Sequence, residues 1–463
     1  MNVLILNPPT FRKNYGSYAD AGGRSQPLGI CYIAAVLEKN GIDVGILDAD
    51  ILNLTLEQTV EEIKKKNPKI LLISILTVDY DNMVKLSNIL KKINPQLKII
   101  VGGPHLSIYP ESAMKNKCFD VGVLGEAEYT TLELVQCMLK NKDYINIKGI
   151  IYTKKDNLVK NPSRELIQDL DELPMPAYNL LPSIDLYHPQ IHSYKYKPVA
   201  SMVTSRGCPY SCIFCDQGVF GKKFRYISGK NIAYQMEKLQ KQFGIREIMF
   251  YDDVFTLNKK RVYDMCNEIE KRKLKMSWSC SSRVDHLDRD LLKCMKKAGC
   301  WMVGVGIESG NQEILDFLKK GLKLEKIKEV TDLAYEEGIK IRGFFQIGHP
   351  KETEKTIEDT INFAKSLKLY AADFLISTPF KGTELYEIAK NYGEFDASDK
   401  SLFSKMFPVF IPKGLTQEFL LKKQKELHRR FYLRPKKIFE YLLLIRGFSD
   451  VKRYLSGAKI LFN

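Results

Sequence analysis

Three cysteines lie close together in the stretch SRGCPYSCIFCDQ, which runs from residue 205 to residue 217. Cys208, Cys212 and Cys215 have the spacing CxxxCxxC and directly follow a predicted strand. A redox dithiol needs two cysteines and a closed structural metal site needs four ligands, so three thiols match neither. Cysteine thiolates hold iron-sulfur clusters, and a cubane of four irons normally takes four of them. The motif therefore predicts a cluster with one open iron.

The other seven cysteines do not offer a good fourth ligand, because they lie in predicted helices, on a predicted strand or far away in the chain. They are Cys31, Cys118, Cys137, Cys266, Cys280, Cys294 and Cys300. Zinc is the alternative occupant, but CxxxCxxC lacks a nearby histidine. Because open coordination is typical of a catalytic metal site, we expect Cys208, Cys212 and Cys215 to be both metal ligands and catalytic residues.

The residues from Val199 onwards alternate short apolar runs with amphipathic stretches. Six predicted strands contain VASMVTS, EIMFYDD, KMSWSCSSR, WMVGVGIES, IKIRGFFQIG and YAADFLISTPF, with helical patterns between them. This rhythm predicts a partial (β/α)6 barrel of the TIM type over residues 196–395. In such a barrel the chemistry takes place at the carboxyl ends of the strands.

Residues 1–140 show the same alternation, with five apolar runs that begin at NVLILN. The pattern predicts a doubly wound, Rossmann-like α/β domain, which binds its ligand beyond the carboxyl ends of its strands. Glycine and polar residues gather at these ends, in NPP, TVDY, GGPH and GEAE. Ordinary turn and cap residues are the alternative for each of them taken singly, so the combination carries the prediction.

Two further regions lack the strand-helix alternation. Residues 141–195 contain a predicted hairpin in GIIYTKKDNLVKNP and a proline-rich stretch, which together indicate a surface linker. Residues 396–463 are predicted to form basic amphipathic helices that break at Pro435. This C-terminal region is either a solvated lid or docking helix, or a surface for an anionic substrate, a partner or a membrane.

The composition is that of a soluble globular protein, with 463 residues, 44% hydrophobic and 27% charged. The sequence has no apolar run long enough to span a membrane and no signal-peptide pattern, and its ten cysteines are mostly scattered, so we expect a cytoplasmic location. The net charge is +16, but from Lys413 onwards 13 basic residues face four acidic ones, so +9 of it lies in the tail. Nucleic-acid binding by the whole protein is therefore not expected.

The cysteine stretch, with Phe214 before the last cysteine, resembles the signature of the radical S-adenosylmethionine (SAM) superfamily. In that family the amino and carboxylate groups of SAM chelate the open iron. FYDDVFT resembles the family's second-strand motif, which meets the methionine end of SAM, and VGVGIES resembles the strand that contacts the ribose. GFFQIGHPKET resembles the fifth-strand motif near the adenine, and STPFKGTELY resembles the turn after the sixth strand. The resemblance implies SAM contacts for Phe214, Asp252, Asp253, Arg283, Glu308, Ser309 and Gln346. Taken alone, Asp252 or Glu308 is equally an ordinary strand-end carboxylate.

The N-terminal domain is similar to the cobalamin-binding domain fused to one large class of radical SAM enzymes, in SQPLGICYIAAVLEKNGIDVGILDAD, IIVGGPHLSIYPE and GVLGEAEYTTLEL. The FYLRP stretch extends the resemblance to relatives of the anaerobic porphyrin-ring cyclase. It implies cobalamin contacts for Asn7, Pro8, Leu28, Gly29, Thr77, Tyr80, Gly102, Gly103, Gly125, Glu126 and Glu128. The DxHxxG motif is missing, so we expect no histidine below cobalt; His105 is a poor candidate, and Tyr80 or water is expected nearby.

The resemblance implies a 4Fe-4S cluster, SAM and cobalamin as cofactors, and an electron donor such as flavodoxin or ferredoxin. A 5′-deoxyadenosyl radical would abstract hydrogen from an unactivated carbon, and methylcobalamin would then methylate it, with the substrate between the two domains. The leading hypothesis is thus a cobalamin-dependent radical SAM C-methyltransferase. The alternatives are a cyclase, oxidative or rearrangement enzyme without net methyl transfer, and a non-enzymatic corrinoid or iron-sulfur sensor. A methylthiotransferase is disfavoured because it needs three more cluster cysteines upstream. The substrate stays open among peptide, polyketide, porphyrin and lipid.

Overall fold

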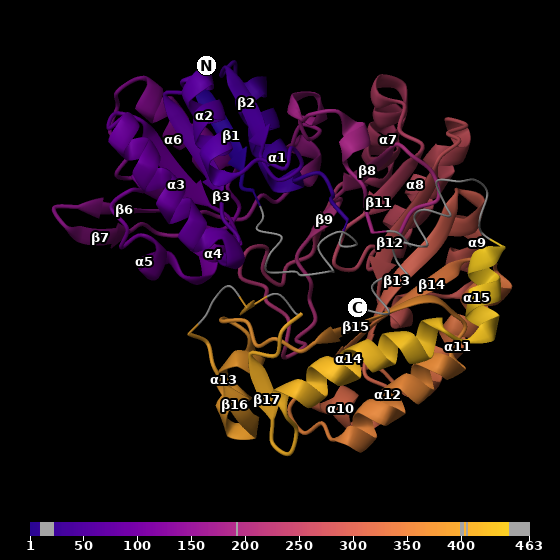
Figure 1. The fold of residues 1–463 in the computed structure, drawn as a ribbon. Helices are drawn as coiled ribbons and strands as arrows, with labels where there is room; N and C mark the ends of the chain where they lie inside the picture. The colour runs from indigo at the N-terminus through magenta and orange to yellow at the C-terminus, as the bar shows by residue number, and fades with distance from the viewer. Residues whose placement is uncertain (10–22, 191–192, 399–401, 404–405, 444–463) are drawn as a thin grey trace. The chain divides into compact units, whose positions relative to one another are not determined.

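The structure is a computed structural model that describes residues 1–9, 23–190, 193–398, 402–403 and 406–443 (Figure 1). Its residues form two compact units. Unit 1 contains residues 1–9, 26–187 and 217–226, and unit 2 contains the rest of the described chain. The chain thus enters unit 2 before the cysteine motif and returns to unit 1 for ten residues directly after it.

Unit 1 is built on a seven-stranded sheet with the order β2-β1-β3-β4-β5-β6-β7. The strands are β1 (Val3–Asn7), β2 (Val44–Asp48), β3 (Ile70–Ser74), β4 (Lys98–Gly102), β5 (Val121–Val123), β6 (Ile150–Lys154) and β7 (Asn157–Lys160). The first five are parallel, while β6 and β7 add antiparallel strands at one edge. The order reverses direction beside β1, which creates the topological switch point where doubly wound sheets bind ligands.

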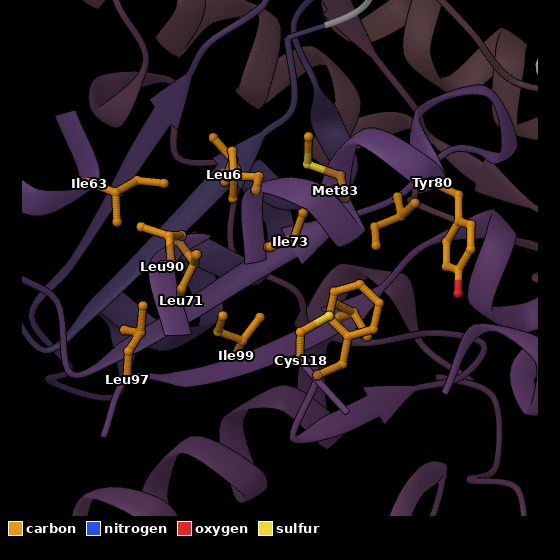
Figure 2. Close-up of a cluster of buried hydrophobic side chains, with 14 of the residues drawn as sticks. Leu6, Ile63, Leu71, Ile73, Tyr80, Met83, Leu90, Leu97, Ile99 and Cys118 are labelled. Carbon is orange, nitrogen blue, oxygen red and sulfur yellow. The ribbon is translucent and has the colours of Figure 1, made fainter. Parts of the chain in front are cut away.

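Helices cover both faces of the unit 1 sheet. They are α1 (Leu28–Lys39), α2 (Leu56–Lys66), α3 (Tyr80–Ile93), α4 (Pro104–Ile108), α5 (Pro110–Ala113) and α6 (Glu128–Leu139), with short 3₁₀ turns η2 (Thr77–Asp79), η3 (Leu170–Glu172), η4 (Tyr178–Leu180) and η5 (Ile184–Leu186). Leu4 and Leu6 of β1 point into a core shared with α2 and α3, of which Ile63, Met83 and Leu90 are part (Figure 2). Val3 and Ile5 alternate with them and face the opposite core, beneath α1 and α6.

Unit 2 contains six parallel strands in the order β15-β14-β13-β12-β11-β8. These strands are β8 (Val199–Met202), β11 (Glu247–Phe250), β12 (Ser277–Ser282), β13 (Cys300–Glu308), β14 (Lys340–Ile347) and β15 (Leu369–Ile376). The shorter strands β9 (Ser205–Arg206), β10 (Arg225–Tyr226), β16 (Gly393–Phe395) and β17 (Phe410–Pro412) lie outside this sheet. Because β8 and β15 are its two ends and do not pair with each other, the barrel is partial.

The helices of unit 2 follow the strands in turn. They are α7 (Gly229–Phe243), α8 (Lys259–Lys271), η6 (Val284–His286), α9 (Arg289–Lys297), α10 (Gln312–Phe317), α11 (Leu324–Glu336), α12 (Glu354–Ser366), α13 (Glu384–Tyr392), α14 (Gln417–Tyr432) and α15 (Pro435–Leu442). Their N-termini are capped where the sequence supplies Ser, Thr, Asn or Asp, as at Ser228 before α7 and Asp288 before α9. Such caps fix where each helix starts, and therefore the length of the loop at each strand end.

Helix α14 packs along β15, the end strand of the barrel sheet (Figure 1). Its side chains bond to the backbone of that strand. The Tyr432 hydroxyl donates to the carbonyl of Ala372 at 2.9 Å and also accepts the amide of that residue at 3.1 Å. One residue pair further along, Gln424 donates to the carbonyl of Phe374, and His428 Nε2 accepts its amide. These bonds satisfy backbone groups that an edge strand would otherwise leave unpaired.

The predicted architecture is confirmed: a doubly wound α/β domain comes first, a partial six-stranded barrel follows, and helices end the described chain. One element differs in its role, because the hairpin predicted in the linker extends the unit 1 sheet as β6 and β7. Its apolar residues Ile150 and Ile151 are buried, which explains why it joins the sheet. The predicted helix break at Pro435 is confirmed, while residues 444–463 lie outside the described residues. None of the described helices is long and apolar enough to cross a membrane.

Candidate active site

The three cysteines of the motif lie on the loop that follows β9 at the carboxyl end of the barrel strands. The loop turns back on itself within the motif, where the amide of Cys215 donates to the carbonyl of Cys212 at 3.1 Å. Strand β9 in turn follows β8, so the motif occupies the first strand end of the barrel. This is where the sequence predicted it.

One side of the cysteine loop is held by Tyr210. The guanidinium of Arg283 lies 3.7 Å from the centroid of the Tyr210 ring, and the tyrosine hydroxyl is hydrogen-bonded to Nε2 of His286. Arg283 follows β12 and is itself fixed, because it donates to Asp285 and to the carbonyl of Lys320. A guanidinium on an aromatic face combines cation–π attraction with stacking, so this contact restrains the loop as well as placing a positive charge beside it.

The other side of the loop is held by Ile213 and Phe214. The amide of Ile213 donates to the carbonyl of Leu318, and its carbonyl accepts the amide of Leu385 at 2.8 Å. Both side chains pack in a small apolar cluster formed with α10 and α13. Phe214, predicted to contact SAM, also lies below two polar groups, with Lys320 Nζ 5.7 Å and the His349 ring 6.1 Å from its centroid.

The thiols of the three cysteines act on one another electrostatically. Burial, followed by the charges of Asp253, Cys208 and Cys212, raises the pKa of Cys215 to about 11. Burial also raises the pKa of Cys208, and the charges of Asp253 and Cys212 add to that effect. The thiols and the carboxylate of Asp253 therefore lie close enough to interact electrostatically. A bound metal reverses this preference, because a coordinating thiol is deprotonated outright.

The donor set fits an iron-sulfur cluster better than a single ion. Among the described residues no group of three or more His, Cys, Asp or Glu side chains forms a site for one metal ion. In a cubane each thiolate binds a different iron, so the sulfurs need to surround a larger body than one ion. The loop supplies three soft thiolate donors, the ligand type that such clusters take, and a fourth cysteine is not among them.

Glu308 ends β13 beside this loop and forms a buried ion pair. Its Oε1 atom accepts a hydrogen bond from Lys320 Nζ at 2.8 Å, and its Oε2 atom accepts one from Gln346 Nε2 at 2.9 Å. Burial opposes the charge, but Lys320 and Gln346 outweigh it, so that the pKa of Glu308 is lowered. The predicted SAM residues Glu308 and Gln346 are thus brought together, and Lys320 joins them.

The backbone around Glu308 is adapted to this ion pair. Glu308 has φ of 68°, an uncommon value for a residue with a side chain, and the pairing of β13 with β14 shifts between Gly306 and Glu308. A Cβ atom on Gly306 would lie 2.5 Å from Glu308 Oε1 and 2.8 Å from Lys320 Nζ. Gly306 therefore leaves room for the charged pair, and strained backbone of this kind tends to occur at functional sites.

His349 and Glu352 follow β14 at the same end of the barrel and are fully buried. Glu352 Oε2 accepts the amides of Gly348 and His349, at 2.6 and 2.9 Å. Neither ring nitrogen of His349, nor Glu352 Oε1, has a hydrogen-bond partner among the described residues. Buried polar atoms are nearly always paired, so these three have hydrogen-bonding capacity left for a water or a bound molecule.

Two other predicted SAM residues are engaged within the protein. Asp252 accepts hydrogen bonds from the amide and hydroxyl of Thr204 and from Arg261, so both its carboxylate oxygens are used. The hydroxyl of Ser309 bonds to Thr360 and accepts the amide of Asn311. These contacts fix the loops after β8 and β13, and SAM contact by either side chain stays a prediction.

In unit 1 the predicted cobalamin residues come together at the carboxyl ends of β1, β3, β4 and β5. A Cβ atom on Gly29 or Gly125 would meet nothing within 4 Å, and one on Gly102 would meet only Val123, at 3.5 Å or more. Gly103 and Gly125 have positive φ, of 93° and 69°, which glycine adopts without strain. Gly29, Gly102 and Gly125 therefore leave space beside the backbone, which would let a large planar group approach it, whereas Gly103 packs closely against Ser74 and Ile75.

The remaining strand-end residues are held by contacts inside unit 1. Asn7 donates to Asp48 at 2.8 Å, and Asp48 also accepts the Tyr187 hydroxyl, at 2.7 Å. The Tyr80 hydroxyl donates to the Ala113 carbonyl, while Thr77 bonds weakly to His105 at 3.3 Å. Pro8, Leu28 and Glu128 are buried. The rings of Tyr80 and His105 lie 4.3 Å apart, so the predicted role of Tyr80 near cobalt competes with a packing role.

Glu126 is engaged in a buried ion pair that sequence reasoning missed. Both its oxygens accept hydrogen bonds from Arg225, at 2.8 and 2.9 Å, and one also accepts the amide of Ile167. Arg225 donates further to the carbonyls of Ile167 and Phe220. The pair holds residues 217–226, the segment that follows the cysteine loop, within unit 1. A cobalamin contact by Glu126 therefore stays a prediction for a side chain that already has partners.

Comparison with known proteins agrees with this arrangement. Residues 18–135 match the B12-binding domain family, and residues 202–364 match the radical SAM superfamily. The chain is 35% identical over 461 residues to an uncharacterized methyltransferase of Pyrococcus horikoshii, covering 99% of this chain and 98% of that one. It is 28% identical to the anaerobic magnesium-protoporphyrin IX monomethyl ester cyclase of Rubrivivax gelatinosus, covering 94% and 78%.

A solved structure has the same fold over nearly the whole chain. The radical SAM methyltransferase TsrM from Kitasatospora setae, with tryptophan and a SAM analogue bound, superimposes with a TM-score of 0.73 at 18% identity, covering 94% of this chain and 89% of that one. The present chain belongs to the radical SAM superfamily and carries a B12-binding domain ahead of its barrel. It is a radical SAM enzyme whose cofactors are a 4Fe-4S cluster, SAM and cobalamin, as the sequence predicted.

Sequence reasoning missed Lys320, Tyr210, His349 and Arg225. Lys319 and Lys320 are neighbours in the sequence. No local pattern shows that Lys319 is exposed whereas Lys320 is buried against Glu308. His349 lies in the motif GFFQIGHPKET, three residues after Gln346, which is predicted to contact SAM. That position is a local signal that could have identified His349 as a site residue. Tyr210 lies between Cys208 and Cys212, and no local pattern shows that its ring is covered by Arg283.

Glu352 makes the stability of unit 2 depend on pH. Burial raises its pKa to about 8, while the amides of His349 and Gly348 oppose the rise. Because the folded state holds this proton more tightly than the unfolded state, the stability it contributes is complete near pH 4 and is lost as the pH rises to about 8. Glu352→Gln keeps a neutral side chain at every pH, so we expect its free energy of unfolding in urea to fall less steeply with rising pH than that of the wild type, by up to about 1.4 kcal/mol per pH unit.

The matched control is Glu354→Gln, which changes an exposed glutamate two residues further on. Unfolding is followed by circular dichroism between about pH 5 and pH 9. Parallel pH profiles for wild type and Glu352→Gln would show that Glu352 is ionised in the folded protein.

Proposed function

We propose that this radical SAM enzyme transfers a methyl group to an unactivated carbon of its substrate. The observation that carries the proposal is the 35% identity, over almost the full length of both chains, to a protein described as a methyltransferase. The site supports it, because three thiols, the Glu308–Lys320 pair and the partnerless atoms of His349 and Glu352 lie at one end of the barrel in unit 2. The open glycines in unit 1 supply the second cofactor site that such a transfer requires.

The chain's own residues hold and orient the reactants. Cys208, Cys212 and Cys215 hold the cluster, and the restraints at Tyr210 and Phe214 keep their loop in place. Arg283 and Lys320 place positive charge near the cysteines, which suits the carboxylate of SAM, and the charge of Glu308 suits its amino group or ribose hydroxyls. His349 and Glu352 offer buried hydrogen-bonding atoms to a nucleoside. The bound cofactors supply the radical and methyl-transfer chemistry.

Ring formation without net methyl transfer is the second candidate, because the chain is also 28% identical to a magnesium-protoporphyrin cyclase over 94% of its length. The residues described above serve both reactions equally, since both need the same three cofactors. Radical SAM enzymes need a reductant, and we propose a flavodoxin or ferredoxin for that role. A sensor without catalysis is less well supported, because Glu308 and Gln346, which are predicted to contact SAM, are present and held together with Lys320.

Transfer of isotope separates the two candidates. The reduced holoenzyme is incubated with SAM carrying a deuterated methyl group and with candidate substrates of the peptide, polyketide, porphyrin and lipid classes. We expect one product to gain the labelled methyl group, as detected by mass spectrometry. A product that is oxidised or cyclised and carries no label would reject methyl transfer and favour the second candidate.

Cys212→Ala removes one cluster ligand. We expect the anaerobically reconstituted variant to lose the brown iron-sulfur absorbance and to release less than about 1% as much 5′-deoxyadenosine as the wild type, because a cluster with two cysteine ligands is not retained. Cys294→Ala, which changes a partly buried cysteine on α9, is the matched control and should keep both properties. Sustained SAM cleavage by Cys212→Ala would reject the cluster assignment.

Glu308→Gln removes the buried carboxylate while keeping its shape. We expect the KM for SAM to rise about tenfold, because a charge-assisted contact contributes about 1.5–3 kcal/mol. Glu358→Gln, which breaks a surface pair with Arg430 on the outside of the barrel, is the control and should leave KM unchanged.

Glu308→Gln also leaves the buried charge of Lys320 without its partner, and this could raise the KM by itself. The double variant Glu308→Gln with Lys320→Met removes both charges at once and so separates the two effects. If this double variant binds SAM as tightly as the wild type, the pair is structural and does not contact SAM. Electron paramagnetic resonance of the reduced cluster, with and without SAM, reports binding independently of turnover.

A further inference from the structure

Helix α15 is attached to the barrel by one face only. Lys437 donates to the carbonyls of Leu369 and Tyr370 at the start of β15, and it pairs with Glu440. The Tyr441 hydroxyl donates to the Tyr370 carbonyl at 2.8 Å. Lys437, Glu440 and Tyr441 lie three and four residues apart, so they share one side of the helix. This attachment fixes which side of α15 faces away from the barrel.

The opposite face of α15 is apolar and exposed. Ile438, Phe439, Leu442 and Leu443 are 45%, 62%, 59% and 69% exposed. They form two pairs four residues apart, so they make one continuous surface, which we call the α15 apolar face. Single exposed apolar residues are ordinary, but four large ones on two helical turns mark an interaction surface.

Helices α14 and α15 are strongly basic. Between Gln417 and Leu443 the chain has eight lysines and arginines against three glutamates. Lys422, Lys425, Arg429 and Lys436 are exposed, whereas Glu426 and Glu440 are paired with cations of the same helices. The pKa of Lys437 is lowered, mainly by burial, and the nearby positive charges of Arg434 and Lys340 lower it further. The α15 apolar face therefore belongs to a pair of helices with an excess of five positive charges.

The charges decide which occupant suits this face. A second copy of the chain would bring the same basic helices against each other, which is unfavourable. The chain after Leu443 has four basic residues and one acidic residue, so its charge is not complementary either. An anionic lipid surface offers negative charge at the headgroups and apolar volume just below them, which matches basic residues beside an exposed apolar face.

We propose that α15, with the basic residues of α14, docks this protein on an anionic membrane surface. The α15 apolar face enters the boundary between headgroups and acyl chains, while Lys422, Lys425, Arg429 and Lys436 lie against the headgroups. The inference is independent of which reaction the enzyme catalyses. In this proposal the C-terminal helices have two roles: their inner faces close the edge of the barrel, and their outer faces bind the membrane surface.

The test is co-sedimentation of the full-length, cluster-loaded protein with lipid vesicles. Vesicles of phosphatidylcholine alone are compared with vesicles in which about one third of the lipid is phosphatidylglycerol, at about 0.1 M and 0.5 M salt. We expect binding to the anionic vesicles at low salt, and at least about tenfold weaker binding without phosphatidylglycerol or at high salt.

Two double variants divide the apolar and electrostatic parts. Phe439→Ser with Leu443→Ser removes half of the apolar face, and Lys422→Glu with Lys436→Glu reverses two charges. Each should weaken binding about tenfold or more, because two large side chains or two charges are lost from the contact. No side-chain hydrogen bond or ion pair is found for these four residues within the described part of the chain, and a retained circular dichroism spectrum checks that the variants fold.

Helix α3 supplies a matched control on the same chain, since it carries the exposed pair Ile89 and Ile93 and the exposed lysines Lys85 and Lys92. Ile89→Ser with Ile93→Ser, and Lys85→Glu with Lys92→Glu, should leave vesicle binding unchanged. Equal loss in these controls, or binding without regard to lipid charge, would overturn the proposal. So would a wild type that stays in the supernatant, or a Phe439→Ser with Leu443→Ser variant that changes only the oligomeric state in sedimentation velocity. Transfer of the deuterated methyl group to product, measured without vesicles, tests the proposed function separately.

Discussion

A buried carboxylate has to be neutralised within hydrogen-bond reach, and this requirement organises the strand ends of unit 2. Glu308 is held by Lys320 and Gln346, which come from the segment after α10 and from β14. The pair needs a neighbour without a side chain, which is Gly306, and a backbone turn at Glu308 itself. Arg283 then bonds to the carbonyl of Lys320 and covers Tyr210, so the same constraint extends to the cysteine loop. One charge balance thus places residues from four strand ends.

The open edge of the barrel is a second constraint, and it is satisfied by side chains. A partial barrel leaves β15 with unpaired backbone groups, and Gln424, His428 and Tyr432 bond to them. Lys437 and Tyr441 continue this row onto α15. Because the inner faces of both helices are used in this way, the large apolar residues of α15 are left on the outside. The closure of the fold therefore creates the surface that we assign to lipid.

The polar residues that follow the strands of unit 1 show how one residue type can serve two purposes. Glu126 and Asn7 lie where ligands bind in doubly wound sheets, and the sequence alone predicts them as cobalamin contacts. In the fold, Glu126 pairs with Arg225 and Asn7 with Asp48. Arg225 is 99 residues further along the chain than Glu126, and no local pattern relates them. The open glycines at Gly102 and Gly125 carry the cofactor argument better, because they have no side chain that a structural contact could use.

The sequence by itself determined the architecture and the class of enzyme, a radical SAM barrel behind a B12-binding domain. Strands with apolar runs, capped helices and the CxxxCxxC loop are local patterns, and local patterns decide the order of the elements and the position of the three thiols. The sequence also predicted Glu308 and Gln346 as site residues, because they lie at strand ends within motifs that resemble those of the family. Only the tertiary structure decided that Lys320 and not Lys319 is buried, that His349 lacks partners among the described residues, and that Asp252 bonds to Arg261. The physical reason is that burial and pairing depend on contacts between strand ends far apart in sequence, whereas periodicity and spacing register only neighbours along the chain.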